Sequence, residues 1–205
     1  MGGLLGVVAD RLATRWPEHD EEHPPGRRVD WRTVVCGVAG AVSFGWLPLR
    51  FPPGVDPLAL ALFASWFATL IVGLATDLDQ RVLSDLTTLP VIPVALLYAV
   101  SGGNPLVRGD LVPAVLAATV IPLALYLPSI PFGAGAFGIG DVKLLVGVGL
   151  MLGLTRAFGG ILFGLLVSGV VLLVLLMTRR IGRRSYVPFG PFLILGAIWA
   201  VLIRG

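Results

Sequence analysis

Two short acidic segments carry the side chains best suited to chemistry in this chain. Residues 76–81 read Thr-Asp-Leu-Asp-Gln-Arg, and residues 138–141 read Gly-Ile-Gly-Asp. Each lies beside a strongly apolar run, and an acid held at a membrane boundary is a candidate for function because burying a carboxylate in lipid is costly. Two carboxylates around one water form an aspartic protease site, in which one acid stays protonated while the other activates the water. The segments therefore predict a hydrolytic acid pair.

The same acids have plainer interpretations. An acid near the end of a span is usually interfacial and solvated, and Gly-x-Gly-Asp is a weak signal in a chain with 27 glycines. Asp79 is interpreted as a solvated loop acid, and Asp85 as the N-cap of the next helix, with Ser84 beside it. A proton-coupled transporter using these acids as protonation sites is an alternative function, disfavoured because no convincing internal repeat is found.

The composition decides the class of protein that must position these acids. Of the 205 residues, 56% are hydrophobic and only 13% are charged, and the mean hydropathy is +0.92. A soluble domain of this size could not bury so much apolar surface. The prediction is an all-α, polytopic membrane helix bundle that forms one domain over residues 1–205.

Windows without charge predict about seven membrane spans. They cover residues 33–49, 57–76, 86–100, 111–127, 141–154, 158–177 and 188–203. Residues 128–140 are apolar but too rich in Pro and Gly for a regular helix. The window 141–154 is the shortest, so its helix is expected to extend into the neighbouring loops.

The chain ahead of these spans divides into a helix and a linker. Residues 1–17 place apolar side chains at helical spacing and predict a short amphipathic helix in the membrane interface. Residues 18–32 form a linker whose two histidines and acids suggest either a metal site or, preferably, a solvated segment. Cys36 is the only cysteine, which excludes a disulfide within the chain and a Cys-based zinc site, and it is predicted to be a small buried residue.

The arginines predict the orientation of the bundle. Three precede the first span, one follows the second and four follow the sixth: Arg27, Arg28, Arg32, Arg81, Arg179, Arg180, Arg183 and Arg184. Strict alternation of seven spans puts all of them on one side, which the positive-inside rule makes cytoplasmic. The N-terminus and both acidic segments are then cytoplasmic.

Three motifs resemble those of the type IV prepilin peptidases. Residues 77–85 resemble their first aspartate motif, an Asp-x-x-x-Arg segment, although Leu-Ser replaces the common Ile-Pro. Residues 138–144 are similar to the second motif, Gly-x-Gly-Asp-x-Lys-Leu, and residues 187–192 to the Pro-Phe-Gly-Pro segment that opens the last span. Residues 3–12 are similar to the short helix that follows the first span in longer members. Order and spacing agree from residue 77 to residue 191.

The resemblance implies an intramembrane aspartic endopeptidase of the GxGD type. Such enzymes cut the leader from prepilin or pseudopilin-like substrates at the cytoplasmic membrane face. Carried onto this chain, the resemblance makes Asp77 and Asp141 the catalytic pair, with no metal and no cofactor. Asp77 is preferred to Asp79 because it stands four residues before the arginine. The supporting residues are Arg81, Gly138, Gly140 and Lys143, and Pro188, Phe189 and Gly190 are substrate-site or structural residues.

Further expectations concern the residues around the acids. The glycines before Asp141 leave room for a substrate backbone. Arg81 can pair with Asp77 or hold the loop at the lipid headgroups. Lys143 lies two positions beyond Asp141 and so points to nearly the opposite helix face. It is expected to snorkel to the interface or to contact an acid of the substrate.

The resemblance also implies a location and partners. The location is the bacterial plasma (inner) membrane, as a multi-pass protein, and the partners are prepilin or pseudopilin proteins and membrane lipid, with no nucleic acid. Bifunctional members carry two Cys-x-x-Cys pairs in a cytoplasmic insertion linked to N-methylation. With one cysteine, this chain is expected to be a peptidase without methyltransferase activity. A non-catalytic pilus-assembly partner stays an alternative, and the substrate and oligomeric state are left open.

Overall fold

The computed structural model describes residues 1–17, 19, 25–54, 56–132, 137–180 and 187–203. Every regular element in these ranges is a helix, as the all-α prediction requires. The elements are α1 (Gly2–Ala13), α2 (Trp31–Arg50), α3 (Pro57–Gln80), α4 (Asp85–Thr88), α5 (Val91–Val100), α6 (Leu111–Tyr126), the 3-10 helix η1 (Leu127–Phe132), α7 (Ile139–Met177) and α8 (Gly190–Leu202).

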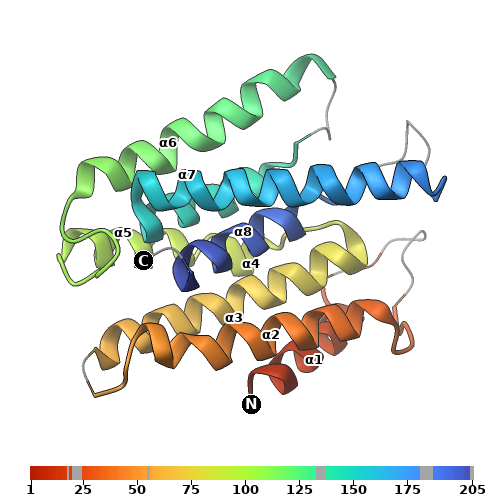
Figure 1. The fold of residues 1–205 in the computed structure, drawn as a ribbon, viewed down its shortest axis with the longest axis horizontal. Coiled ribbons are helices and arrows are strands. Elements are labelled where there is room, and N and C mark those ends of the chain that lie inside the picture. The colour runs from red at the N-terminus through yellow and green to blue at the C-terminus, as the bar shows by residue number, and fades with distance from the viewer. Residues whose placement is uncertain (18, 20–24, 55, 133–136, 181–186, 204–205) are drawn as a thin grey trace.

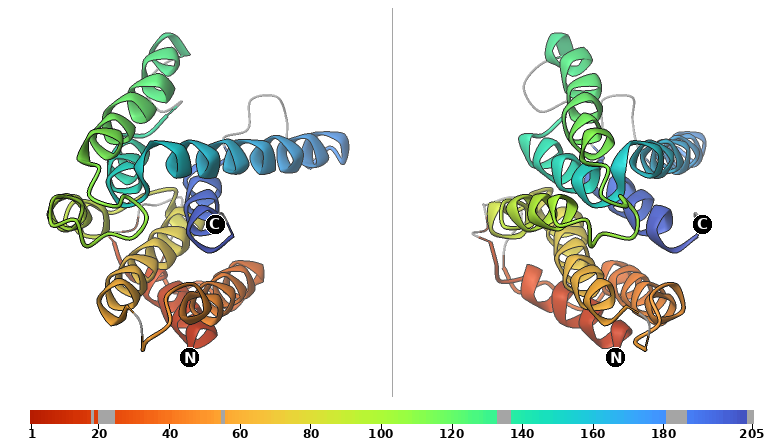
Figure 2. Two further views of the ribbon diagram at one scale, coloured as in Figure 1. Left: turned by 60° about the vertical axis from the view of Figure 1, so that its left-hand side comes forward. Right: turned by 90° about the vertical axis from the view of Figure 1, so that its left-hand side faces the viewer.

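The helices form an elongated bundle in two groups. Helices α1, α2 and α3 lie on one side, α6 and α7 lie on the other, and α8 and α5 lie between them (Figures 1 and 2). Large side chains of α3, α7 and α8 meet in the buried core, including Phe67, Leu145 and Ile194. The core therefore joins the helices that carry the two acidic segments.

Four of the described helical segments are long and apolar enough to cross a membrane. They are Trp31–Arg50, Pro57–Gln80, Leu111–Pro131 and Ile139–Met177, and the shorter apolar segments are Asp85–Val100 and Gly190–Leu202. This pattern fits a membrane helix bundle. The exposed apolar side chains along these helices fit contact with lipid.

The windows predicted over residues 141–154 and 158–177 belong to one element, α7, which is broken at Gly153. Gly153 has φ 69° and ψ 172°, a conformation that glycine adopts without steric cost. Positions in both arms of α7 approach the first half of α8, Asp141 near Gly190 and Gly164 near Phe192. The ribbon accordingly turns back at the break (Figure 1). Two predicted spans are thus the two arms of α7.

Glycine lets α7 approach α6 and α8 closely. A Cβ at Gly149 of α7 would lie 2.4 Å from the backbone N of Ala118 in α6. A Cβ at Gly160 would lie 2.6 Å from the carbonyl oxygen of Gly196 in α8. Real Cβ contacts are not this short, so both crossings depend on residues without side chains. These crossings fix α7 between α6 and α8.

The N-terminal helix packs on the bundle through small residues. Gly6, Ala9 and Asp10 are buried against α2 and α3, whereas Leu4 and Val8 are exposed. The interfacial location of α1 stays a prediction. Residues 18 and 20–24 of the linker lie outside the described residues. The described linker histidine, His19, has a side chain only 5% exposed beside Asp79, so at that position the prediction of a solvated segment is wrong. Cys36 is buried, as predicted.

Candidate active site

Asp77 lies in the last turn of α3. The helix ends because Arg81 adopts the left-handed conformation (φ 58°, ψ 33°), and the Arg81 backbone N–H donates to the Asp77 carbonyl over 3.0 Å. The Asp77 side chain is nearly fully buried, and within the described part of the chain its Oδ2 accepts no hydrogen bond. A buried carboxylate oxygen without a partner is costly in a purely structural role, so Asp77 is a candidate functional residue.

Asp141 lies in the first turn of α7. Gly138 is the N-cap, and its backbone N–H donates to Oδ2 of Asp141 over 3.3 Å, which closes a capping-box bond. The positive end of the helix dipole also favours a carboxylate at this position. The second motif thus fixes its acid through the backbone of its own first glycine.

The two acids converge on a third residue, Gly190, at the start of α8. A Cβ built on Gly190 would lie 2.6 Å from Oδ2 of Asp77 and 3.2 Å from Oδ1 of Asp141. The two carboxylate oxygens are therefore no farther apart than the sum of these distances. The Cα of Gly190 closes one side of the acid pair, and any larger residue would intrude on it. Three segments distant in sequence meet at this point.

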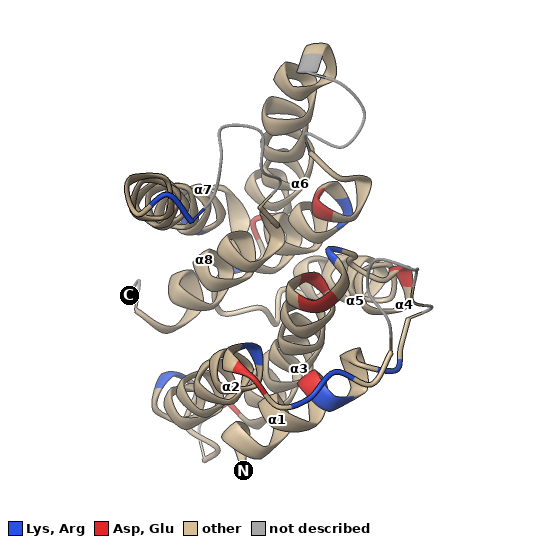
Figure 3. Cartoon of the chain, turned by 90° about the vertical axis from the view of Figure 1, so that its right-hand side faces the viewer, with Lys and Arg blue, Asp and Glu red and all other residues tan. Residues whose placement is uncertain are grey.

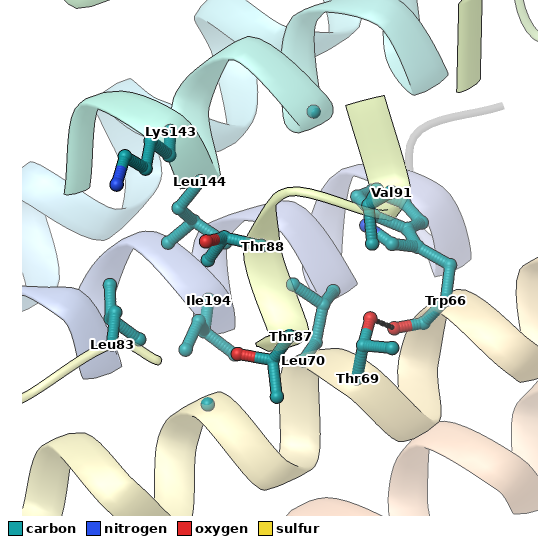
Figure 4. Close-up of a pocket in the computed structure, with 12 residues that line it drawn as sticks. Trp66, Thr69, Leu70, Leu83, Thr87, Thr88, Val91, Lys143, Leu144 and Ile194 are labelled. Atoms are coloured by element: carbon teal, nitrogen blue, oxygen red, sulfur yellow. Dashed lines mark hydrogen bonds between the residues drawn. The ribbon is translucent and has the colours of Figure 1, made fainter. Parts of the chain in front are cut away.

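An open pocket lies over the acids. Its lining comes from the end of α3, the following loop and the start of α7: Asp77, Arg81, Val82, Leu83, Gly138, Gly140 and Asp141. Leu83 also lines a second pocket between α3, α4, α7 and α8 (Figure 4), so it borders both. A Cβ at Gly140 would lie 2.9 Å from Cβ of Leu83. In this structure Gly140 therefore makes room for Leu83 of the same chain.

The segment before α8 contributes an aromatic wall. Phe189 is the N-cap residue of α8, and its ring lies 5.9 Å from that of Phe137 at an interplanar angle of 60°. Pro188 precedes it and is half-buried. The edge-to-face contact links the start of α8 to the residue just before the Gly138–Asp141 segment. This contact helps to keep Gly190 next to Asp141.

Lys143 pairs with an acid outside the candidate pair. Its Nζ lies 2.6 Å from Oδ1 of Asp85, and both side chains are partly exposed. Lys143 thus points away from Asp141, as the helix geometry predicts, but its partner is an acid of its own chain. The N-cap of α4 is Ser84, whose Oγ accepts from the Leu86 N–H, so the prediction of Asp85 as the cap is wrong by one residue.

The structure differs from one of the two roles predicted for Arg81 and from the role predicted for Asp79, while the contact of Arg81 with lipid headgroups stays a prediction. Arg81 lines the pocket with Asp77, but among the described residues no ion pair joins the two side chains. The prediction that Asp79 is a solvated loop acid is wrong. Asp79 is only 6% exposed and pairs with Arg27 and Arg32. Residues two positions apart on a helix point to nearly opposite faces, so the side chains of Asp77 and Asp79 contact different neighbours.

Sequence reasoning did not find the ion-pair network behind Asp79. Charged segments of α1, the linker, α2 and α3 gather at one end of the bundle (Figure 3). Asp10 and Arg27 are its central members, joined over 2.5 Å. The only signal of this network in the sequence was Asp10, an acid in a predicted helix with many apolar residues. Its partner Arg27 lies in an irregular segment, where no periodic pattern helps to predict contacts.

Comparison with known proteins identifies the family. A model of the type IV leader peptidase family matches residues 53–177. The chain is 32% identical over 178 residues to a prepilin leader peptidase/N-methyltransferase of Aeromonas hydrophila, covering 86% of this chain and 57% of that protein. It is 28% identical over 178 residues to a type 4 prepilin-like proteins leader peptide-processing enzyme of Escherichia coli O78:H11, covering 86% and 63%.

A third relative is the prepilin leader peptidase/N-methyltransferase of Burkholderia pseudomallei strain 1026b, 30% identical over 158 residues, with 77% of this chain and 50% of that protein covered. The chain thus spans about half to two thirds of the length of these relatives. No solved structure matches it. Because the family model covers more than half of the chain and runs through both acidic motifs, the chain belongs to the type IV leader peptidase family.

Proposed function

We propose that this chain is an intramembrane aspartic endopeptidase that removes the leader from prepilin or pseudopilin-like substrates. One observation carries the proposal: Asp77 of α3 and Asp141 of α7 converge on Gly190 of α8. The pocket over the acids gives a peptide access to them. Family membership and the names of the relatives support the substrate class.

The proposed mechanism uses a water held between the two carboxyl groups. One acid is ionised and takes a proton from the water as its oxygen attacks the scissile carbonyl carbon. The other acid is protonated and donates to the carbonyl oxygen, and a proton then passes to the leaving amine as the C–N bond breaks. Asp77, with its unpaired Oδ2, and Asp141, with one oxygen held by Gly138, fill these two roles. A side chain at Gly190 would crowd both acids, because a Cβ there would lie 2.6 Å from Oδ2 of Asp77 and 3.2 Å from Oδ1 of Asp141.

The orientation follows from the arginines. Arg27 and Arg32 pair with Asp79 in the last turn of α3, and Arg81 lines the pocket with the two acids. Arg179 and Arg180 follow α7, whose C-terminal end lies at the same end of the bundle as the end of α3 (Figure 1). The positive-inside rule supports a cytoplasmic location for this end. We therefore place cleavage at the cytoplasmic face of the bacterial inner membrane, where the leader of a membrane-inserted prepilin would lie.

We propose further that this chain does not methylate its product. The relatives from Aeromonas hydrophila and Burkholderia pseudomallei are named for both activities, whereas this chain has one cysteine, Cys36, buried in α2. It therefore lacks the cysteine pairs expected of the bifunctional enzymes. Adding S-adenosylmethionine to a cleavage assay should leave the product mass unchanged. A mass increase of one methyl group would refute this part of the proposal.

Substitution of either acid tests the peptidase. Purified protein in lipid nanodiscs is incubated with a cognate prepilin, and the product mass gives the cleavage site. The Asp77→Asn and Asp141→Asn variants should each cleave at least about 1,000-fold more slowly than wild type. The matched control is Asp110→Asn, which changes an exposed acid at the other end of the bundle. A wild-type cleavage rate in either Asp77→Asn or Asp141→Asn would refute the assignment of these two acids as the catalytic pair.

A further inference from the structure

An ion-pair network joins the N-terminal segments to the end of α3. Arg27, in the linker, lies at its centre and contacts three carboxylates. Its Nε donates to Oδ1 of Asp79 over 2.6 Å, its Nη2 donates to Oδ1 of Asp10 over 2.5 Å, and its Nη1 pairs with Asp30. One guanidinium thus connects α1, the N-cap of α2 and the last turn of α3.

The α3 member of this network, Asp79, is well enclosed. Its side chain is only 6% exposed, and its Oδ1 also accepts from Nη1 of Arg32 over 3.0 Å. Nε2 of His19 lies 3.6 Å from its Oδ2. A carboxylate buried to this extent needs its cations, because removing one partner of a buried pair leaves an uncompensated charge.

The α1 member, Asp10, is completely buried. Burial alone would raise its pKa, but hydrogen bonds from Thr33, Arg11 and Arg27 outweigh it and hold the pKa of Asp10 below its ordinary value. The same carboxylates, Asp10 and Asp79, raise the pKa of Arg27 despite its burial. Asp10 and Arg27 therefore stay ionised at neutral pH.

A second contact ties the same turn of α3 to α1. Nε2 of Gln80 donates to the Ala13 carbonyl over 2.8 Å and contacts Nε2 of His19 over 3.1 Å. Asp79 and Gln80 thus face α1 and the linker, while Asp77 faces Gly190. The N-terminal segments hold one side of the helical turn whose other side presents the candidate catalytic acid.

We propose that Arg27 and Asp79 are positioning residues, whose ion pair fixes the last turn of α3 so that the Asp77 carboxylate stays against Gly190 and Asp141. The expected effect of this ion pair on the cleavage rate rests on the proposed function. Neither residue lines the acid pocket. Their effect passes through the α3 backbone over two residues. A displacement of about 1 Å at a catalytic group costs on the order of 100-fold in rate, so loss of this hold affects turnover more than binding.

The kinetic test uses the full chain in nanodiscs with a prepilin substrate. Asp79→Asn should lower kcat by about 10- to 100-fold with KM within about twofold of wild type. Arg27→Gln should do the same, and the double variant should be no slower than the slower single one, because the two act as a unit. Asp79→Glu, which keeps the charge, should recover part of the rate.

Asp56→Ala is the matched control for general damage to α3. Asp56 caps the opposite end of the same helix by accepting from the Ala59 N–H over 3.0 Å. Its loss should lower the unfolding temperature without changing kcat. A folded Asp79→Asn variant with wild-type kcat would overturn the inference, as would an Asp56→Ala variant that loses as much kcat as Asp79→Asn.

A second measurement does not need catalysis. Cysteines replace Asp77 and Asp141 in a Cys36→Ala background, and the rate of cross-linking by a short bis-maleimide is measured. Asp79→Asn should slow cross-linking several-fold relative to Asp56→Ala. If wild type cleaves no prepilin, the proposed function fails while this result still decides the positioning role. An unchanged cross-linking rate would overturn it.

Discussion

Nζ of Lys143 lies 2.6 Å from Oδ1 of Asp85, an acid 58 positions earlier in the chain. The bond joins the first turn of α7 to the start of α4, on the side of α7 that faces away from Asp141. It thereby braces the loop that carries Leu83, which lines the acid pocket. Lys143 of the second motif (residues 138–144) is thus bound to Asp85, the final acid of the first motif (residues 77–85).

The Lys143–Asp85 pair should add little to stability. Both side chains are partly exposed, Asp85 by 59%, so water screens the attraction. Lys143→Gln should change the unfolding free energy by less than about 1 kcal/mol. A double-mutant cycle with Asp85→Asn, measured by denaturant unfolding in detergent, checks this value. A coupling energy well above it would contradict the estimate.

Gly190→Ala should abolish most of the cleavage activity. The new Cβ would lie 2.6 Å from Oδ2 of Asp77, so α8 or the acids must move. We expect a loss of at least about 100-fold in kcat, measured in the prepilin assay. Gly169→Ala is the matched control, because a Cβ there meets nothing within 4 Å. Similar activity in the two variants would argue against a close acid pair.

Gly149→Ala should destabilise the bundle. A Cβ at this position would lie 2.4 Å from the Ala118 backbone N, so the crossing of α6 and α7 must widen. Overpacking of this kind costs about 1–3 kcal/mol. Gly45→Ala in α2, where a Cβ meets nothing, should instead be neutral or slightly stabilising. Thermal unfolding in one detergent compares them, and equal melting temperatures would contradict the close crossing.

Acid should weaken the attachment of α1 through Asp10. Its pKa in the folded chain is below the ordinary value of about 3.9, so the unfolded chain takes up the proton first as the pH falls. The stabilising contribution is complete above about pH 5 and is lost progressively below about pH 4. Unfolding measured from pH 6 to pH 3 should show this loss in wild type and less of it in Asp10→Asn. An identical slope in both would contradict the prediction.

The sequence predicted most helices because lipid imposes simple rules on composition. The start of α3 follows from Asp56 and Pro57, since Asp is a good N-cap and Pro fits the first helical turn. The break in α7 was not placed at Gly153, because nothing distinguishes this glycine from its many neighbours in an apolar run. Its positive φ is set by the packing of both arms against α6 and α8.

The candidate pair could be predicted because its two motifs are short and local. What the sequence could not provide is the partner of each remaining charged residue. Asp79 and Asp85 both looked solvated or local, yet each binds a cation from a distant segment, Arg27 and Lys143 respectively. Such pairs depend on how helices cross, and single-sequence patterns carry no information on that.

The place of Gly190 has a consequence for biosynthesis. Asp77 and Asp141 enter the membrane with α3 and α7, but the backbone against which they meet arrives with α8. A nascent chain halted before residue 190 holds both acids and lacks the surface that brings them together. The ribosome therefore delivers the last component of the candidate acid pair only after α3 and α7 have been made.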